Sequence, residues 1–441
     1  MAAHATLLMR RLYTALWWTA LPALPVRLWW RGRRERGYRE HVRERFGRYE
    51  IARPAGEVIW VHAVSLGETR AAAPLVARLL RERPDASVLL THMTATGRAS
   101  GASLANPRVI QAWLPYDLPF AVRRFLDHFA PRAGLLMETE LWPNLLAEAR
   151  ARGIPVLLVN ARLSERSARR YARAPKLSRE LFGNLAGVAA QGERDAHRLR
   201  ALGANDVTVI GNLKFDMRVP DEARDQGRAL RARLSQARPV WIAASTRDGE
   251  EALIVDALLA ARAALPAGAV TVIVPRHPQR FGAVAQLLRE RGLRFAQRSD
   301  AEPLAADVDV FLGNSVGELL TYYAAADVAF VGGSLLPLGG QNLIEPLAVG
   351  TPTLVGPHTF NFADATEYAI AAGAAERVAD APALIRAVGA LLRDSGRRNA
   401  MRASAQAFFA AHRGATDRLW GWLAPRIAGA PAEDTSRASG D

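Results

Sequence analysis

Three glutamates follow apolar segments of the sequence, where a carboxylate could take part in proton transfer. The first, Glu68, belongs to the motif HAVSLGET, with Ser65 and Gly67 just before it. It falls in the first turn of a predicted helix, a position that favours the ionised carboxylate, and it could act as a general base on a hydroxyl. An ordinary helix cap explains the same residue equally well.

The other two glutamates, Glu138 and Glu140, lie in the motif METELWPN after another apolar run. Alternate residues of an extended segment point the same way, so we expect both carboxylates to face one ligand. The alternative is a solvated strand end with a packed Trp. Lys214 in GNLKFD, one of only two lysines, could meet a phosphate or a carboxylate, or could pair with Asp216.

Paired glycines between Phe311 and Pro357 predict a phosphate site. A strand candidate ends in Gly332 and Gly333, and a second glycine pair precedes a predicted helix over 341–349 that contains Glu345. Backbone amides at a helix N-terminus bind phosphate, and a carboxylate one turn inside can hold ribose hydroxyls. The alternative is that these glycines only form the turns of an ordinary α/β repeat.

The motif VPRHP places Arg276 and His277 after a further strand candidate. Arg276 can donate two parallel hydrogen bonds to a phosphate or a carboxylate, whereas a lone histidine is more often packed or solvated than a ligand. No P-loop, HExxH or GxGxxG fingerprint is present, and no DxD-type pair is convincingly placed, so we expect no metal and no bound cofactor. Basic residues are not interleaved with aromatics beyond the N-terminal segment, which argues against nucleic acid.

These motifs need elements to position them, and apolar runs alternating with helical patterns predict parallel sheets. The expected strands are 58–61, 87–91, 135–137, 156–159, 188–190 and 207–210, then 240–244, 270–274, 308–312, 328–331 and 353–355. Predicted helices include 68–81, 222–237, 250–264 and 395–412. The two sets predict an α/β protein with two Rossmann-like domains, 51–220 and 221–424, facing each other across a cleft. The terminal helix is expected to cross back, and 425–441 to form a disordered tail.

The 441 residues carry a net charge of +15 and no cysteine, which is typical of a protein that meets anions and needs no disulfides. Residues 1–50 hold 11 Arg against 4 Glu and an uncharged run, 12–26, shorter than the roughly 20 residues that span a bilayer. Four tryptophans there suggest interfacial anchoring: Trp17, Trp18, Trp29 and Trp30. We expect a membrane anchor; the alternative is a buried core helix with a basic tail.

Taken together, the motifs closely resemble the 3-deoxy-D-manno-octulosonic acid (Kdo) transferases of lipopolysaccharide synthesis. The resemblance covers nearly the whole chain to about Ala424. Its strings occur in the family's order: HAVSLGET, METELWPN, NARLSERSARRY, GNLKFD, VPRHP, GNSVGEL and FVGGSLLPLGGQNLIEPLAVGTP.

The resemblance implies a GT-B glycosyltransferase that moves Kdo from CMP-Kdo to a lipid A precursor (lipid IVA), with inversion and without a metal. It implies the cytoplasmic face of the inner membrane, one N-terminal anchor, and Glu68 as the base. The implied donor-binding residues are Pro275, Arg276, His277, Gly313, Asn314, Ser315, Gly317, Glu318, Gly332, Gly333, Asn342 and Glu345. The implied acceptor and cleft residues are Ser65, Gly67, Glu138, Glu140 and Lys214.

Two other functions stay open on sequence grounds. A GT-B transferase could use another nucleotide sugar on a soluble acceptor, which dependence on CMP-Kdo would distinguish. A membrane-surface binding protein could keep the fold without activity, which a single-turnover assay would distinguish.

Overall fold

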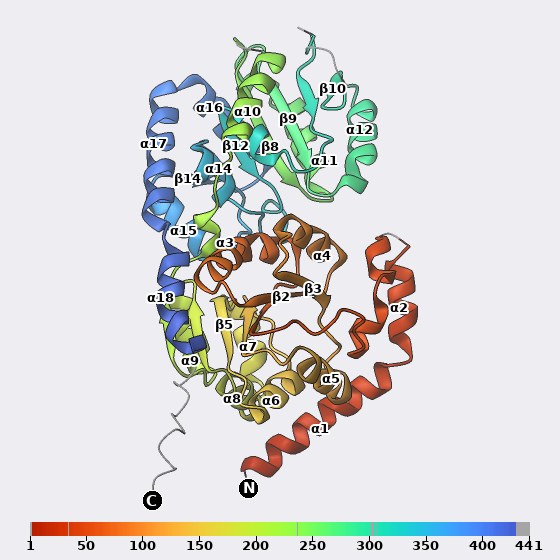
Figure 1. Ribbon diagram of the computed structural model, residues 1–441. Coiled ribbons are helices and arrows are strands. Elements are labelled where there is room, and N and C mark those ends of the chain that lie inside the picture. The colour runs from red at the N-terminus through yellow and green to blue at the C-terminus, as the bar shows by residue number, and fades with distance from the viewer. Residues whose placement is uncertain (1, 34, 236, 301–303, 306, 429–441) are drawn as a thin grey trace, which may run out of the picture. The chain divides into compact units, whose positions relative to one another are not determined.

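The computed structural model describes residues 2–33, 35–235, 237–300, 304–305 and 307–428 (Figure 1). The described chain forms two compact units. The first contains the residues up to Met217 together with those from Gly414 onward, and the second contains Arg218–Arg413. Each unit has a seven-stranded, all-parallel sheet, so the predicted α/β class with two parallel-sheet domains is confirmed.

The sheet of the first unit has the order β3-β2-β1-β4-β5-β6-β7. The direction of the strand order reverses at β1, which pairs with both β2 and β4. Loops at the carboxyl ends of such neighbouring strands are where open α/β sheets bind ligands. The strands are β1 (Val58–His62), β2 (Ser87–His92), β3 (Val109–Trp113), β4 (Ala133–Met137), β5 (Val156–Ala161), β6 (Gly187–Ala190) and β7 (Val207–Val209).

Helices cover both faces of this sheet, which explains why its strands read as continuous apolar runs. Trp60 belongs to a core formed with α5, α6, α8 and α9, while Ile59 belongs to the opposite core, formed with α3 and α18. The helices are α3 (Leu66–Glu82), α4 (Ala95–Gly101), α5 (Pro119–Phe129), α6 (Pro143–Ala151), α7 (Glu165–Ala172), α8 (Pro175–Gly183), α9 (Glu193–Ala201) and α18 (Ala415–Ala428).

The second unit repeats this plan with the order β10-β11-β9-β8-β12-β13-β14, which reverses at β8. Its strands are β8 (Val240–Thr246), β9 (Val270–Pro275), β10 (Phe295–Gln297), β11 (Val310–Leu312), β12 (Val328–Val331), β13 (Thr353–Val355) and β14 (Ala375–Arg377). Its helices are α10 (Asp221–Leu234), α11 (Glu250–Ala260), α12 (Phe281–Glu290), α13 (Leu319–Ala325), α14 (Ile344–Val349), α15 (Ala363–Ala371), α16 (Ala381–Arg393) and α17 (Ser395–His412).

The N-terminal segment 1–50, predicted as a part of its own, is packed into the first unit over its described residues. It forms α1 (Ala2–Ala20), α2 (Ala23–Arg31) and two short 3₁₀ turns. Leu24 and Leu28 are buried. The Glu44 carboxylate accepts hydrogen bonds from the Trp113 amide and from Arg98, both at 2.7–2.8 Å. Arg45, 2% exposed, stacks on the Trp113 ring.

Nothing in the described part of the chain is a helix long and apolar enough to cross a membrane. One of the predicted interfacial residues needs correction: Trp17 faces inward, with ring centroids 5.6 Å from Tyr116 and 6.3 Å from Trp142. Both helices nevertheless carry large apolar side chains at exposed positions, among exposed Arg11 and Arg27. The apolar side chains that are more than half exposed are Leu12, Leu16, Trp18, Val26, Trp29 and Trp30.

Several predicted element bounds also change. The helix expected over 341–349 begins only at Ile344, and the one expected over 250–264 ends at Ala260, before a 3₁₀ turn. Helix α18 runs to Ala428, so 425–428 are helical rather than part of a tail. The rest of the predicted tail, 429–441, lies outside the described residues. The expected cleft between the domains remains a prediction.

Candidate active site

Glu68 stands where the strand order of the first sheet reverses, in the first turn of α3 after β1. Its carboxylate accepts hydrogen bonds from the Val64 amide at 2.7 Å and from the Ser65 hydroxyl at 3.2 Å. Ser65 is the N-cap residue, and its oxygen accepts in turn from the Glu68 amide. Glu68 therefore takes part in the helix cap, as the alternative for this residue predicted. The same hydrogen bonds fix the position of its carboxylate. Exposed Gly67 lies beside it on the same turn.

The environment of this carboxylate disfavours its charge. Burial, followed by the negative charge of Glu138, raises the pKa of Glu68 to about 8. Hydrogen bonds to Val64 and Ser65 oppose the rise but do not cancel it, and Glu140 adds to it. A carboxyl group with a pKa near neutrality is suited to accept a proton from a hydroxyl during reaction.

Glu138 lies just beyond β4, the strand that neighbours β1. Its carboxylate pairs with Lys214 Nζ at 2.8 Å and with Arg162 at 3.8 Å. Burial alone would raise the pKa of Glu138, but the two cations outweigh burial and lower it. Glu138 therefore stays ionised beside Glu68, where its charge adds to the effect of burial on the pKa of Glu68.

One expectation about the motif METELWPN is wrong. Glu138 has the left-handed φ of 59° and begins a turn, so Glu138 and Glu140 do not alternate along an extended segment. They are nonetheless close, because Glu138 contributes, after burial, to a raised pKa of Glu140. In the motif GNLKFD, the Asp216 carboxylate accepts hydrogen bonds from the Gly414 and Thr416 amides at the start of α18.

In the second unit, the loop after β12 folds around one buried carboxylate. Glu250, fully buried at the start of α11, accepts hydrogen bonds from three amides: Gly333 at 2.5 Å, and Leu335 and Arg247 at 2.9 Å. Gly332 passes so close to β8 that a Cβ there would lie 2.7 Å from the Thr246 Cα. Gly332 and Gly333 therefore shape the loop at the reversal point between β8 and β12.

Arg276, Asn342 and Glu345 lie together beside this loop. Arg276 Nε donates to the Gln341 side chain at 3.1 Å, and the Gln341 amide donates to the Gly332 carbonyl. Asn342 donates to the Glu345 carboxylate at 3.1 Å and accepts from the amide that opens α14. The structure thus brings one guanidinium, one amide and one carboxylate to the carboxyl edge of the sheet.

Exposed His277, next to Pro275 at the end of β9, lies among cations. Burial lowers its pKa, and the nearby charges of Arg247, Arg276 and Arg280 lower it further. Arg280 is already paired with Asp248 and Glu251, so Arg247 and Arg276 are the cations beside this imidazole that favour an anionic ligand.

The remaining predicted donor residues form a separate group after β11. Gly313 packs closely against β9, and Gly317 has φ 87° beside open space. The Asn314 side chain bonds to Ser299, and the Ser315 hydroxyl to Tyr322 at 2.7 Å. The Glu318 carboxylate forms a bidentate ion pair with Arg298, so both of its oxygens already have a partner within the protein. These hydrogen bonds and ion pairs run to Arg298 and Ser299 after β10 and to Tyr322 on α13.

Sequence reasoning missed several residues that shape these sites. Arg162, Asn160 and Gln341 all lie inside motifs that the sequence displays, but nothing in their spacing revealed their partners. Asn160 has φ 51°, and its side-chain oxygen accepts from the Leu213 amide, which positions the turn that carries Lys214. Asparagine tolerates this left-handed conformation, and that was the available signal.

Known proteins place this arrangement in a family. The family model described as 3-deoxy-D-manno-octulosonic-acid transferase (kdotransferase) matches residues 40–217. The 3-deoxy-D-manno-octulosonic acid transferase of Bordetella pertussis is 49% identical over 94% of this chain and 99% of its own length. The enzyme of that name from Haemophilus influenzae is 38% identical over 88% of this chain and 92% of its own.

Solved structures agree on the fold. A glycosyltransferase from Rickettsia africae has a TM-score of 0.58 at 12% identity, over 86% of this chain and all of that one. At this identity the likeness shows the fold alone. The match in sequence, by contrast, extends over almost the entire chain: this protein belongs to the family of 3-deoxy-D-manno-octulosonic acid transferases, which are glycosyltransferases.

Proposed function

We propose that the protein transfers Kdo from CMP-Kdo to a lipid A precursor, lipid IVA, with Glu68 as the general base and with inversion at the anomeric carbon. The observation that carries the proposal is the Glu68 carboxylate, fixed by Val64 and Ser65 with a pKa near 8, at the reversal point of the first sheet. Glu68 removes the proton from the acceptor hydroxyl as the oxygen attacks the sugar. Attack from the face opposite CMP gives inversion.

The second unit offers what a departing nucleotide needs. CMP leaves as a phosphate monoester, whose negative charge Arg276 and Arg247 stabilise in this proposal, without a metal. In this proposal the hydrogen-bonded pair Asn342 and Glu345 binds the ribose hydroxyls.

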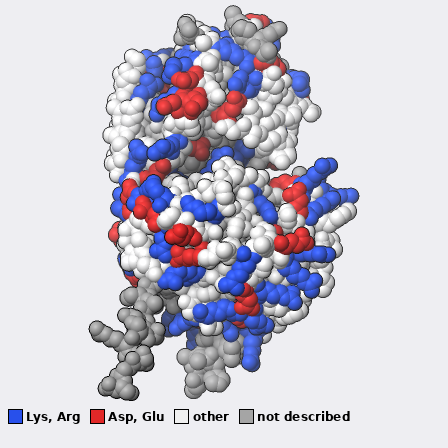
Figure 2. All heavy atoms as spheres, in the orientation of Figure 1, with Lys and Arg blue, Asp and Glu red and all other residues white. Residues whose placement is uncertain are grey.

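The N-terminal helices suit the surface of the inner membrane on its cytoplasmic side. Their outward side chains include six large apolar residues, and lysine and arginine gather on the side of the first unit where α1 and α2 lie (Figure 2). We infer that these helices lie in the interface as an amphipathic anchor. Complete release of the intact protein from membranes by high salt alone would rule out the apolar part of this attachment.

A single-turnover reaction with CMP-Kdo and lipid IVA tests the proposed function. We expect one Kdo per enzyme to be transferred, with the opposite anomeric configuration from the donor, in buffer containing a chelator. Transfer from a UDP sugar but not from CMP-Kdo would favour the alternative transferase, and no transfer from any donor would favour a binding protein.

Arg276→Ala is expected to raise the KM for CMP-Kdo about 10- to 100-fold, because a charge-assisted hydrogen bond contributes about 1.5–3 kcal/mol. The matched control is Arg289→Ala, an exposed arginine on α12. Steady-state kinetics with varied donor provide the measurement. An unchanged donor KM in Arg276→Ala would remove Arg276 from the donor site.

The activity should depend on pH through Glu68. Since only the carboxylate accepts a proton, kcat/KM should fall about tenfold per pH unit below the pKa near 8 and level off above it. Glu138→Gln removes the neighbouring negative charge and should move the whole profile to lower pH. Glu140→Gln, a weaker cause of the raised pKa, should move the profile less. An identical profile in Glu138→Gln and wild type would contradict the coupling between the two carboxylates.

A further inference from the structure

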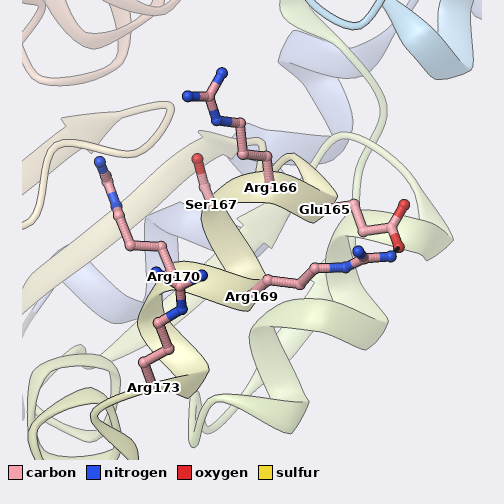
Figure 3. Close-up of a pocket in the computed structure, with 6 residues that line it drawn as sticks. All are labelled: Glu165, Arg166, Ser167, Arg169, Arg170 and Arg173. Carbon is pink, nitrogen blue, oxygen red and sulfur yellow. Dashed lines mark hydrogen bonds and ion pairs between the residues drawn. The ribbon is translucent and has the colours of Figure 1, made fainter.

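Four arginines gather on helix α7, which the proposed mechanism does not use. These residues, Arg166, Arg169, Arg170 and Arg173, are all exposed and are called the α7 arginine cluster below. With Glu165 and Ser167 they line a cavity of about 600 Å³ (Figure 3). A cavity walled largely by guanidinium groups is built for an anion.

The protein itself supplies little negative charge to this cluster. Glu165 forms an ion pair with Arg169, one turn away. Figure 3 shows Arg169 turned towards Glu165, while Arg166 and Arg170 point elsewhere. Within the described residues, Arg166, Arg170 and Arg173 form no ion pair with a carboxylate. At least two positive charges are therefore left for a ligand.

The position of α7 links the cluster to the candidate active site. The chain leaves β5 at Ala161, Arg162 pairs with Glu138, and α7 begins three residues later. On the inward side of α7, Tyr171 packs on Phe182 with ring centroids 5.2 Å apart. Burial raises the pKa of Tyr171, the positive charge of Arg170 opposes the rise, and Glu140 is close enough to add to it.

The same helix lies near the membrane-facing segment. The Tyr171 carbonyl accepts a hydrogen bond from Ser178 on α8, and α8 packs against α1. The α7 arginine cluster thus stands within one unit between two features, the carboxylates at the sheet edge and the apolar outward face of α1. Consider an amphiphile whose acyl chains lie at α1. If its hydroxyl reaches Glu68, its polar head group lies close to α7.

We infer that the α7 arginine cluster binds a phosphate monoester group of the acceptor lipid and so orients its hydroxyl for reaction. This inference rests on the proposed function, because it identifies part of the acceptor that the same site uses. A phosphate dianion accepts the forked donors of two arginines at once, which a neutral sugar hydroxyl cannot do.

The test compares the double variant Arg166→Gln/Arg170→Gln with Arg53→Gln/Arg386→Gln. The control pair loses the same charge from exposed positions, one before β1 and one on α16 in the second unit. With lipid IVA, the cluster variant should show an acceptor KM raised about 10- to 100-fold, with the donor KM and the thermal midpoint unchanged. With the acceptor enzymatically stripped of its phosphates, the cluster variant and the control should have equal KM values.

Other outcomes would overturn the inference. Equal acceptor KM values in the two variants would do so, and so would an equal loss with the stripped acceptor. A second arm measures flotation with vesicles of anionic phospholipid that lack the acceptor. If the cluster variant lost only this binding, the arginines would serve membrane headgroups instead. Absence of transfer by the wild type would refute the proposed function. If the wild type transfers Kdo but the acceptor KM of the cluster variant is unchanged, only the inference about the α7 arginine cluster is refuted.

Discussion

Glu68→Ala is expected to lower kcat by about 10²–10⁴-fold, the usual cost of losing a general base. Glu68→Gln should lose nearly as much, because the amide keeps the shape of the side chain but cannot accept the proton. Both variants should bind CMP normally, since the nucleotide is assigned to the second unit. The measurement is single-turnover transfer together with CMP affinity by calorimetry.

The control for this prediction is Glu82→Gln, at the opposite end of the same helix. It should retain wild-type transfer, because Glu82 pairs with Arg78 on the surface. Activity above about one per cent in Glu68→Ala would contradict the assignment of the base. A large drop in thermal midpoint in Glu68→Gln would show that the capping hydrogen bonds matter more than the proton transfer.

Glu250→Ala should cost the second unit about 3–5 kcal/mol of unfolding free energy, although Glu250 contacts no predicted substrate. Its carboxylate satisfies three amides, and a methyl group would leave those donors without an acceptor in a fully buried place. The loop at Gly332 and Gly333 would lose its support. Chemical denaturation measures the change in unfolding free energy. It is followed by the fluorescence of Trp241, which is buried in a core of the second unit.

Glu290→Ala on α12 is the control, because that carboxylate is exposed and accepts a hydrogen bond from the Gln286 side chain. Its unfolding free energy should stay within about 0.5 kcal/mol of the wild type. A Glu250→Ala protein of wild-type stability would mean that water or a shifted loop satisfies the three amides. Donor KM should rise in Glu250→Ala even at temperatures where the unit remains folded.

The sequence was informative wherever helices cover a strand on both faces. The central strands β1 and β8 are buried at every position, so their apolar runs were readable. Of the four edge strands, only β7 was predicted; β10 is FAQ and β14 is AER, three residues each, with no more signal than a loop. Strand β3, with its half-buried Gln111, was missed for the same reason.

The individual site residues were easier to predict than their partners. Glu138 and Lys214 are 76 positions apart, and only the order β1-β4-β5-β6-β7 brings the ends of these strands together. The same holds for Glu250 and Gly333, 83 positions apart. A motif shows which residue types follow a strand, but the neighbours of that strand depend on sheet order, which local patterns do not encode.

Helix α18 also affects the order in which the chain can fold during synthesis. Leu419, Leu423 and Ile427 of this helix complete the core that Leu75 and Leu79 of α3 begin. Arg78 and Asp417 join the two helices at 2.8 Å. Residues up to Met217 are synthesised before the second unit, yet the face of their sheet that α3 covers stays partly uncovered until α18 is made. The contiguous second unit can finish folding earlier, so the unit whose strands come earlier in the sequence is completed last.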